Sequence, residues 1–158
     1  MIRVATPQDI AAIARLFQSV QDLHVTHVPG MFKQPSDDAV LAAWLARVFT
    51  DSSAYVLLAE ESEKAVGYLY AKEVRKEENV IKPALHYFSL EHIAVLPAFQ
   101  RRGVGTELMR ALLAEMEIRK ISRIELAVWS FNGKAQRFFA RHGFAVFNQW
   151  METFVTDV

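Results

Sequence analysis

The stretch that most constrains the fold is a long apolar run over residues 84–96, which ends at Pro97 and leads into a glycine-containing turn. Proline lacks the N–H that a strand ladder needs, so a strand is expected to end before Pro97. Apolar side chains at helical spacing then begin at Val104 and continue to Met116. The segment therefore predicts a strand that passes through a tight turn directly into a helix.

The remaining pattern places further elements on both sides of this junction. We expect strands over 2–5, 54–59, 65–72 and 123–129, helices over 7–24, 36–48 and 132–142, and one or two final strands over 144–155. The order is β-α-α-β-β-β-α-β-α-β(β), with neither a repeat nor a linker. It predicts one mixed α/β (α+β) domain over residues 1–158, with a central, mostly antiparallel mixed sheet flanked by helices.

The composition narrows the range of partners. The 158 residues carry 18 Lys and Arg against 18 Asp and Glu, so no net field attracts nucleic acid or a membrane surface. No cysteine is present, which excludes disulfides, thiolate metal sites and a cysteine nucleophile. No apolar run reaches the ~20 residues of a membrane span, and the first residues lack the apolar core of a signal peptide. We expect a cytoplasmic protein without nucleic-acid, membrane or metal partners.

The turn before the helix has the character of a phosphate site. A helix N-terminus leaves about four backbone N–H groups unpaired and carries partial positive charge. Gly103 and Gly105 remove side chains that would keep an anion away from these donors, and Arg101 and Arg102 add charged donors beside them. The residues therefore predict a cradle for a phosphate or pyrophosphate.

Two common phosphate motifs do not fit this turn. A P-loop requires a lysine after its last glycine, and none follows Gly105. A dinucleotide fingerprint requires a third glycine where Leu108 stands, and the predicted element order is not a run of βαβ units.

Two motifs instead resemble those of the GCN5-related N-acetyltransferase (GNAT) superfamily. The residues Q-R-R-G-V-G from Gln100 resemble its [QR]-x-x-G-x-[GA] signature, and the preceding strand ends in V-L-P, as such strands commonly do. The residues from Asn132 to Phe144 resemble the second coenzyme motif, N-x-x-A-x-x-[LF]-Y-x-x-x-G-F. The similarity in element order covers essentially the whole chain.

The resemblance implies acetyl-CoA as co-substrate. The pantetheine arm is expected along the strand that ends at Val95, the pyrophosphate on the turn that follows, and Asn132 with its helix beside the coenzyme. The coenzyme-binding residues that it implies are Ile93, Ala94, Val95, Gln100, Arg101, Arg102, Gly103, Val104, Gly105, Thr106, Asn132, Ala135 and Phe139.

Transfer to an amine requires a base, because an alkyl ammonium with a pKa of about 10.4 must lose a proton before it attacks the thioester. Glu91 is the candidate, since strict alternation places it on the same side of its strand as Tyr87, Ile93 and Val95, in an apolar setting, and it resembles the base of several family members. Alternation points His92 to the opposite face, although a bulge would exchange the two.

One position departs from the family pattern. Phe139 stands where the family commonly has tyrosine, whose hydroxyl protonates the leaving thiolate; phenylalanine has no such group. The acid is then water, another residue such as Tyr87, or absent, which a thiolate of pKa about 8.5 tolerates. The function predicted is acetyl-CoA-dependent N-acetyl transfer to a primary amine, and the alternative is a non-catalytic acetyl-CoA sensor or a protein-interaction module.

The amine itself is not identified by the sequence. The connection between the first two helices and the C-terminal strands line the acceptor side in the family, which makes His24, His27, Phe32, Tyr87 and Glu152 candidate substrate contacts. A polyamine, an aminoglycoside, an amino acid and a protein amine all remain open. A homodimer formed through the terminal strands is compatible with the sequence.

Overall fold

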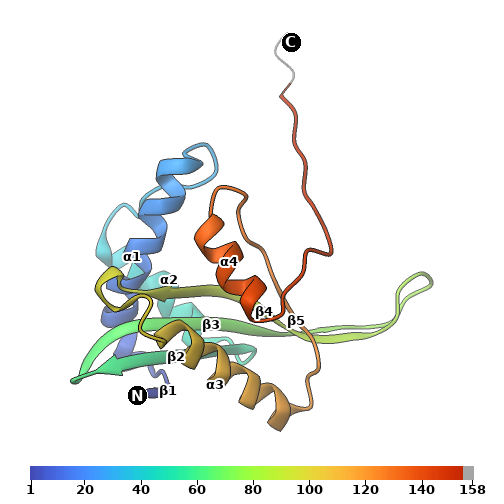
Figure 1. Cartoon of the computed structure of the whole chain (residues 1–158), viewed down its shortest axis with the longest axis horizontal. Helices are drawn as coiled ribbons and strands as arrows, with labels where there is room; N and C mark the ends of the chain where they lie inside the picture. The colour runs from blue at the N-terminus through green and yellow to red at the C-terminus, as the bar shows by residue number, and fades with distance from the viewer. Residues whose placement is uncertain (155–158) are drawn as a thin grey trace. The chain divides into compact units, whose positions relative to one another are not determined.

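The structure is a computed structural model that describes residues 1–154, which group into two compact units, 1–127 and from Val128 onward. The first unit is built on a five-stranded sheet in the order β1-β2-β3-β4-β5 (Figure 1). The strands are β1 (Ile2–Val4), β2 (Ala54–Glu61), β3 (Lys64–Lys76), β4 (Leu85–Val95) and β5 (Ile124–Leu126). Neighbouring strands are antiparallel except β5, which runs parallel to β4.

Helices cover both faces of this sheet. The helices α1 (Ile10–His27) and α2 (Asp38–Thr50) pack on one face, where Ile13 and Leu45 join Tyr68 in a buried cluster. The helix α3 (Val104–Arg119) packs on the other face and buries Leu108 and Leu112 completely. Alternate residues of a strand point to opposite faces, so helices on both faces bury both sets. Strands β2 and β3 therefore each contain a continuous run of buried residues.

Local sequence signals account for where the helices begin. A one-turn 3-10 helix, η1 (Pro7–Asp9), precedes α1, and the Asp9 carboxylate accepts from the Thr6 N–H at 2.8 Å. The Asp37 carboxylate caps α2 by accepting from the Val40 N–H at 2.8 Å. A second 3-10 turn, η2 (Pro97–Phe99), links β4 to α3.

The second unit contains α4 (Gly133–Arg141). Asn132 caps its start, since its side-chain oxygen accepts from the Ala135 N–H at 3.1 Å. Gly143 follows its end with a φ of +83°, a left-handed conformation that favours glycine. Both ends of the helix are therefore set by local chemistry.

The predicted fold class is confirmed, and the single domain over residues 1–158 stays a prediction. The predicted final strands are wrong over residues 144–154, which form no strand; Val155 lies outside the described residues. Large apolar side chains in this segment, such as Trp150 and Met151, are almost fully exposed. An alternating pattern marks a chain suited to a strand, but a strand also needs a partner edge, which the pattern does not supply.

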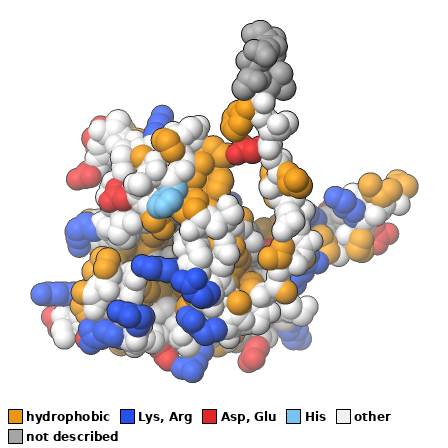
Figure 2. Space-filling view, turned by 45° about the horizontal axis from the view of Figure 1, so that its top comes forward, with side chains coloured by type: hydrophobic (Ala, Val, Ile, Leu, Met, Phe, Trp, Pro, Cys, Tyr) orange, Lys and Arg blue, Asp and Glu red, His pale blue; other side chains and the backbone are white. Residues whose placement is uncertain are grey.

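Strand lengths also differ from those predicted. β5 covers three residues where 123–129 was expected, and β3 extends past Lys72 to Lys76, opposite the first residues of β4. The resulting hairpin projects from the sheet (Figure 1), and Val80 and Ile81 give it an exposed apolar tip (Figure 2). In the described part of the chain, no helix combines the length and apolar character needed to cross a bilayer.

Candidate active site

The turn between β4 and α3 presents a row of unused backbone donors. Gly103 has a φ of +89° and Arg101 a φ of +60°, so the backbone curls at both positions. The first N–H group of α3 that has a backbone acceptor is that of Glu107, which donates to the Gly103 carbonyl at 2.9 Å. Among the described residues nothing accepts from the N–H groups of residues 101–106. Such a row, at the positive end of a helix, favours an anion.

Two side chains of the turn already have partners. Gln100 donates from Nε2 to the Val95 carbonyl at 2.9 Å, which ties the turn to the end of β4. Arg102 donates to the Glu61 carboxylate at 2.7 Å and lies over the Phe99 ring, 5.1 Å from its centroid. The Gln100 side chain therefore supports the backbone of the turn. The guanidinium of Arg102 lies beside the turn, paired with Glu61.

The last part of β4 has an open edge. β5 pairs with β4 only from Phe88 to Leu90, so among the described residues the β5 side of 91–95 has no neighbouring strand. An extended ligand with amide groups can hydrogen-bond to such an edge as an added strand would. The predicted residues Ile93, Ala94 and Val95 lie along this edge, directly before the turn.

Gly67 on β3 lets the two strands approach closely at this point. A Cβ at Gly67 would lie 2.8 Å from the Ala94 carbonyl oxygen and 3.2 Å from a methyl of Val95. No side chain fits at that distance without displacing the β4 backbone. Gly67 was not predicted as a site residue, although a glycine inside an apolar strand pattern is a recognised sign of close backbone approach.

A bulge in β4 changes the predicted directions of its side chains. Tyr70 pairs with His92 but Ala71 pairs with Leu90, so Glu91 has no partner residue on β3. The extra residue turns His92 toward the α1 and α2 face, where it lies against the Tyr68 hydroxyl and the Phe17 and Trp44 rings. His92 and Tyr87 pair with Tyr70 and Val74, which lie an even number of residues apart on β3, so His92 and Tyr87 share a face. Strict alternation, which separated His92 from Tyr87, is therefore wrong here. Glu91 is exposed, so the apolar setting expected for it is not found.

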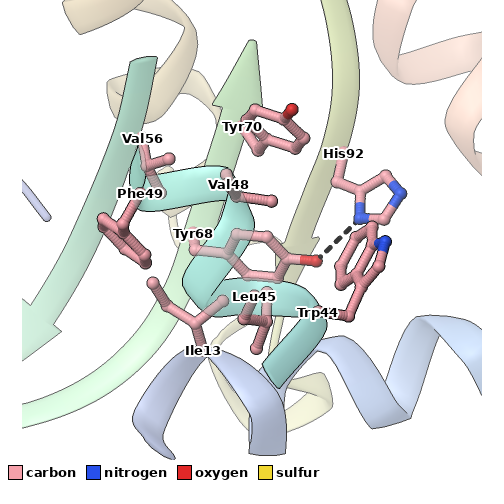
Figure 3. Close-up of a pocket in the computed structure, with 9 residues that line it drawn as sticks. All are labelled: Ile13, Trp44, Leu45, Val48, Phe49, Val56, Tyr68, Tyr70 and His92. Atoms are coloured by element: carbon pink, nitrogen blue, oxygen red, sulfur yellow. Dashed lines mark hydrogen bonds between the residues drawn. The ribbon is translucent and has the colours of Figure 1, made fainter. Parts of the chain in front are cut away.

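His92 lies in a buried, mostly aromatic setting. Its Nδ1 is 3.1 Å from the Tyr68 hydroxyl oxygen, and Figure 3 shows the second ring nitrogen directed away from Tyr68. Burial lowers the pKa of His92, the charge of His24 acts the same way, and the charge of Glu91 opposes both. Burial also raises the pKa of Tyr68, which keeps its hydroxyl protonated. The imidazole is therefore held neutral and available to accept a proton.

Rings from three further elements surround this histidine. Phe17 of α1 lies 5.2 Å from His92 between ring centroids, Trp44 of α2 lies 6.1 Å away and stacked, and Tyr70 of β3 stands edge-on at 6.1 Å. We call Phe17, Trp44, Tyr70 and His92 the aromatic cluster. The sequence analysis assigned none of Phe17, Trp44 and Tyr70 to the site.

The residues predicted to contact the acceptor amine do not all lie together. His24 and Phe32 lie together, 4.8 Å between ring centroids, and His24 is near enough to influence His92. Tyr87 is buried four residues before Glu91, about 13 Å along the strand. Its ring lies beneath the Lys76 ammonium at 5.5 Å. His27 bonds to the Leu23 carbonyl at 2.9 Å in the last turn of α1.

The remaining predicted residues belong to the second unit. Asn132 uses its side-chain oxygen as the cap of α4, and Ala135 supplies the N–H that it binds. Phe139 packs against Phe138 and Phe144, with centroids 5.3 and 5.5 Å away. Glu152 is exposed in the segment after α4. The roles of these residues stay predictions. Among the described residues no group of three metal-binding side chains is assembled.

Comparison with known proteins agrees with this geometry. A model of the Acetyltransferase (GNAT) family matches residues 17–144. No curated protein sequence is significantly similar to the chain. Among solved structures, the tetramutant of the BH1408 protein from Bacillus halodurans is 24% identical, with a TM-score of 0.92 over 98% of this chain and 99% of that chain.

Two further structures share the fold at lower identity. An aminoglycoside N-acetyltransferase, AAC(6')-Iy in complex with CoA, is 16% identical, with a TM-score of 0.73 over 98% of each chain. A ribosomal-protein-alanine N-acetyltransferase from Brucella melitensis is 18% identical, with a TM-score of 0.70 over 98% of this chain and 96% of that chain. Since the family model spans most of the sequence, the chain belongs to the acetyltransferase (GNAT) family.

Proposed function

We propose that the protein transfers the acetyl group of acetyl-CoA to a primary amine. The observation that carries the proposal is the continuity of two unused backbone surfaces, the open edge of β4 over 91–95 and the free N–H groups of 101–106. The first suits an extended amide-containing arm and the second suits a pyrophosphate. Coenzyme A carries both groups in that order, and the AAC(6')-Iy neighbour was solved with CoA.

In this proposal the coenzyme lies along β4 and ends on the turn. The pantetheine amides bond to the backbone near Ile93 and Val95, and the pyrophosphate accepts from the N–H groups of the turn. Arg102 exchanges its partner Glu61 for a phosphate. Gly67 supports this placement because it keeps β3 close behind Ala94 without a side chain in the way. The coenzyme contacts of Asn132, Ala135 and Phe139 stay predictions from the resemblance to the family.

The nitrogen loses two protons between ammonium and amide, one before the attack and one after it, and the leaving thiolate takes one. The neutral amine nitrogen attacks the thioester carbonyl carbon, the N–C bond forms, and the oxyanion is stabilised by a backbone N–H near Val95. The nitrogen then loses its second proton to water, the C–S bond breaks, and coenzyme A leaves as a thiolate that takes a proton from water. The ammonium proton goes to a base at the bulge, either the Glu91 carboxylate or the neutral His92.

The geometry favours His92 over Glu91 as that base. Burial keeps His92 uncharged, and in the tautomer whose Nδ1–H donates to the Tyr68 oxygen, Nε2 carries the lone pair that a base needs. Glu91 is exposed beside it and suits a relay of the proton to solvent. Accordingly, His92→Asn should lower kcat strongly with little change in acetyl-CoA affinity, while Glu91→Gln should lower kcat less. A larger loss in Glu91→Gln would return Glu91 to the role of base.

The decisive experiment has two parts. Calorimetric titration with acetyl-CoA should show micromolar binding, and release of free thiol in the presence of an amine panel should follow. Absence of acetyl-CoA binding would refute the proposal. A homodimer and a cytoplasmic location stay predictions, which light scattering and cell fractionation address.

One observation favours a second candidate function. Phe139 has no hydroxyl, so it offers no acid for the leaving thiolate, and its ring packs against Phe138 and Phe144. A non-catalytic acetyl-CoA sensor would bind the coenzyme and release no thiol with any amine. If Phe139→Tyr created activity that the parent lacks, the sensor would be the better description.

A further inference from the structure

The aromatic cluster combines buried rings with one ring that is partly exposed. Tyr70 is 9% exposed and Phe17 is 9% exposed, whereas Trp44 is 43% exposed although its ring stacks on His92. Phe17 and Trp44 are 5.5 Å apart between centroids. The cluster therefore has a buried aromatic floor and one large indole at the rim, next to the proposed base.

The space enclosed by these rings is too small for a substrate. The hollow behind them measures about 10 Å³, close to what a single water needs, and Figure 3 shows the side chains that close it. Its lining contains no Lys, Arg, Asp or Glu: Ile13, Trp44, Leu45, Val48, Phe49, Val56, Tyr68, Tyr70 and His92. A ligand thus meets the cluster at its rim, where the Trp44 side chain is partly exposed.

The charges around the cluster suit one ammonium and not several. Glu91 acts on both Tyr70 and His92, and it is a single carboxylate. The other acidic group that acts on Tyr70 is Asp51, which is already paired with Lys72 at 2.8 Å. A polycation would leave most of its charges without a carboxylate here, whereas ring faces and one carboxylate satisfy a single ammonium.

We infer that the acceptor is a monoamine carried on a short chain from an aromatic ring, the ring stacking on Trp44 at the rim of the aromatic cluster and the nitrogen reaching the bulge of β4. This inference rests on the proposed acetyl transfer. A flat ring would pack against the exposed part of this indole, and a short chain would carry the amine past its edge toward His92 and Glu91. Trp44 is then the residue that determines specificity.

The test compares acceptors in the thiol-release assay with acetyl-CoA saturating. Phenethylamine and tryptamine should have kcat/KM values at least about ten-fold above those of spermidine and kanamycin, because an aromatic pair with its buried area contributes on that scale. Ethylamine, which has the amine without the ring, should be as poor as the polycations. A preference for spermidine or kanamycin would overturn the inference.

Substitution of Trp44 assigns the preference to this residue. Trp44→Ala should lower kcat/KM for phenethylamine about five- to ten-fold more than it lowers kcat/KM for ethylamine, while Trp44→Phe should restore most of the difference. Trp150→Ala removes an exposed tryptophan of the second unit and is the matched control, with no expected effect. An equal loss for both amines in Trp44→Ala would mean a structural role and would overturn the inference.

Failure of this inference can be told apart from failure of the proposed function. Acetyl-CoA binding is measured separately by calorimetry on the same samples. Without that binding the acetyltransferase proposal falls, and the acceptor inference falls with it. With binding intact, acetylation of polycations and not of aromatic monoamines refutes the acceptor inference alone. Binding without acetylation of any amine in the panel favours the sensor over acetyl transfer, and the acceptor inference then falls with the proposed function.

Discussion

The Tyr68 hydroxyl oxygen lies 3.1 Å from Nδ1 of His92, and this contact joins the two central strands of the sheet beneath the aromatic cluster. Both residues face α1 and α2, and burial disfavours the charged form of each side chain, which raises the pKa of Tyr68 and lowers that of His92. The hydrogen bond therefore fixes the ring of a histidine that the fold keeps neutral.

The stability of the protein should depend on pH through His92. Its pKa is lowered by burial, so the unfolded chain, with a value near 6.5, binds this proton more readily than the native state. The contribution is fully present above about pH 6.5 and is lost as the pH falls through the lowered native value. Urea unfolding at neutral and acidic pH should show the free energy of unfolding falling on the acidic side.

His92→Asn isolates this effect from the other titrating groups. The variant cannot bind the proton, so its free energy of unfolding should fall less between neutral and acidic pH than that of the parent. Glu91 and His24, whose charges act on His92, remain in place in both proteins. An identical fall in parent and variant would show that other groups carry the dependence.

Glu61→Gln should strengthen coenzyme binding. Glu61 holds Arg102 at 2.7 Å, so a phosphate must displace this carboxylate before it gains the guanidinium. The pair is exposed, so removing it should tighten acetyl-CoA binding by only about two- to five-fold. The effect should shrink at high salt, as calorimetry at two ionic strengths would record.

Glu63→Gln provides the matched control for this effect. Glu63 lies two residues after Glu61, in the turn between β2 and β3, and loses the same charge, but among the described residues the salt bridge of Arg102 is to Glu61. Its effect on affinity should be smaller. Equal tightening in both variants would point to the general field of the turn and away from the Arg102 contact.

Gly67→Ala should destabilise the protein. Its Cβ would lie 2.8 Å from the Ala94 carbonyl oxygen, which is backbone and cannot turn aside, so β4 must shift at a cost of about 1–3 kcal/mol. Because the shift falls on the edge proposed for pantetheine, acetyl-CoA affinity should fall as well. Gly30→Ala, where nothing lies within 4 Å, should be neutral in chemical denaturation and in binding.

Gly103→Ala separates backbone strain from coenzyme binding. Gly103 and Gly143 have φ values of +89° and +83° with no atom within 4 Å of a Cβ, so alanine at either should cost about 1–2 kcal/mol of stability. Only Gly103 adjoins the free N–H groups of the turn. Gly103→Ala should therefore weaken acetyl-CoA binding about ten-fold, and Gly143→Ala should leave it unchanged.

The sequence by itself determined the features that depend on neighbours along the chain. Pro97 and Gly103 mark the junction between β4 and α3, and Asn132 and Gly143 set the ends of α4. Each of these signals acts through a residue's own dihedral angles or a hydrogen bond within three residues, so no knowledge of the rest of the fold is needed. The motifs around them were enough to predict the fold class.

Tertiary structure alone decided how the site is assembled. Whether Glu91 or His92 faces the acceptor depends on a bulge, which is set by the pairing of β4 with β3 and not by the pattern of β4 itself. The open edge at 91–95 depends on where β5 stops, and the place of Trp44 beside His92 depends on how α2 packs. These contacts join residues far apart in the sequence, so periodicity, which reports only which face is apolar, leaves them undetermined.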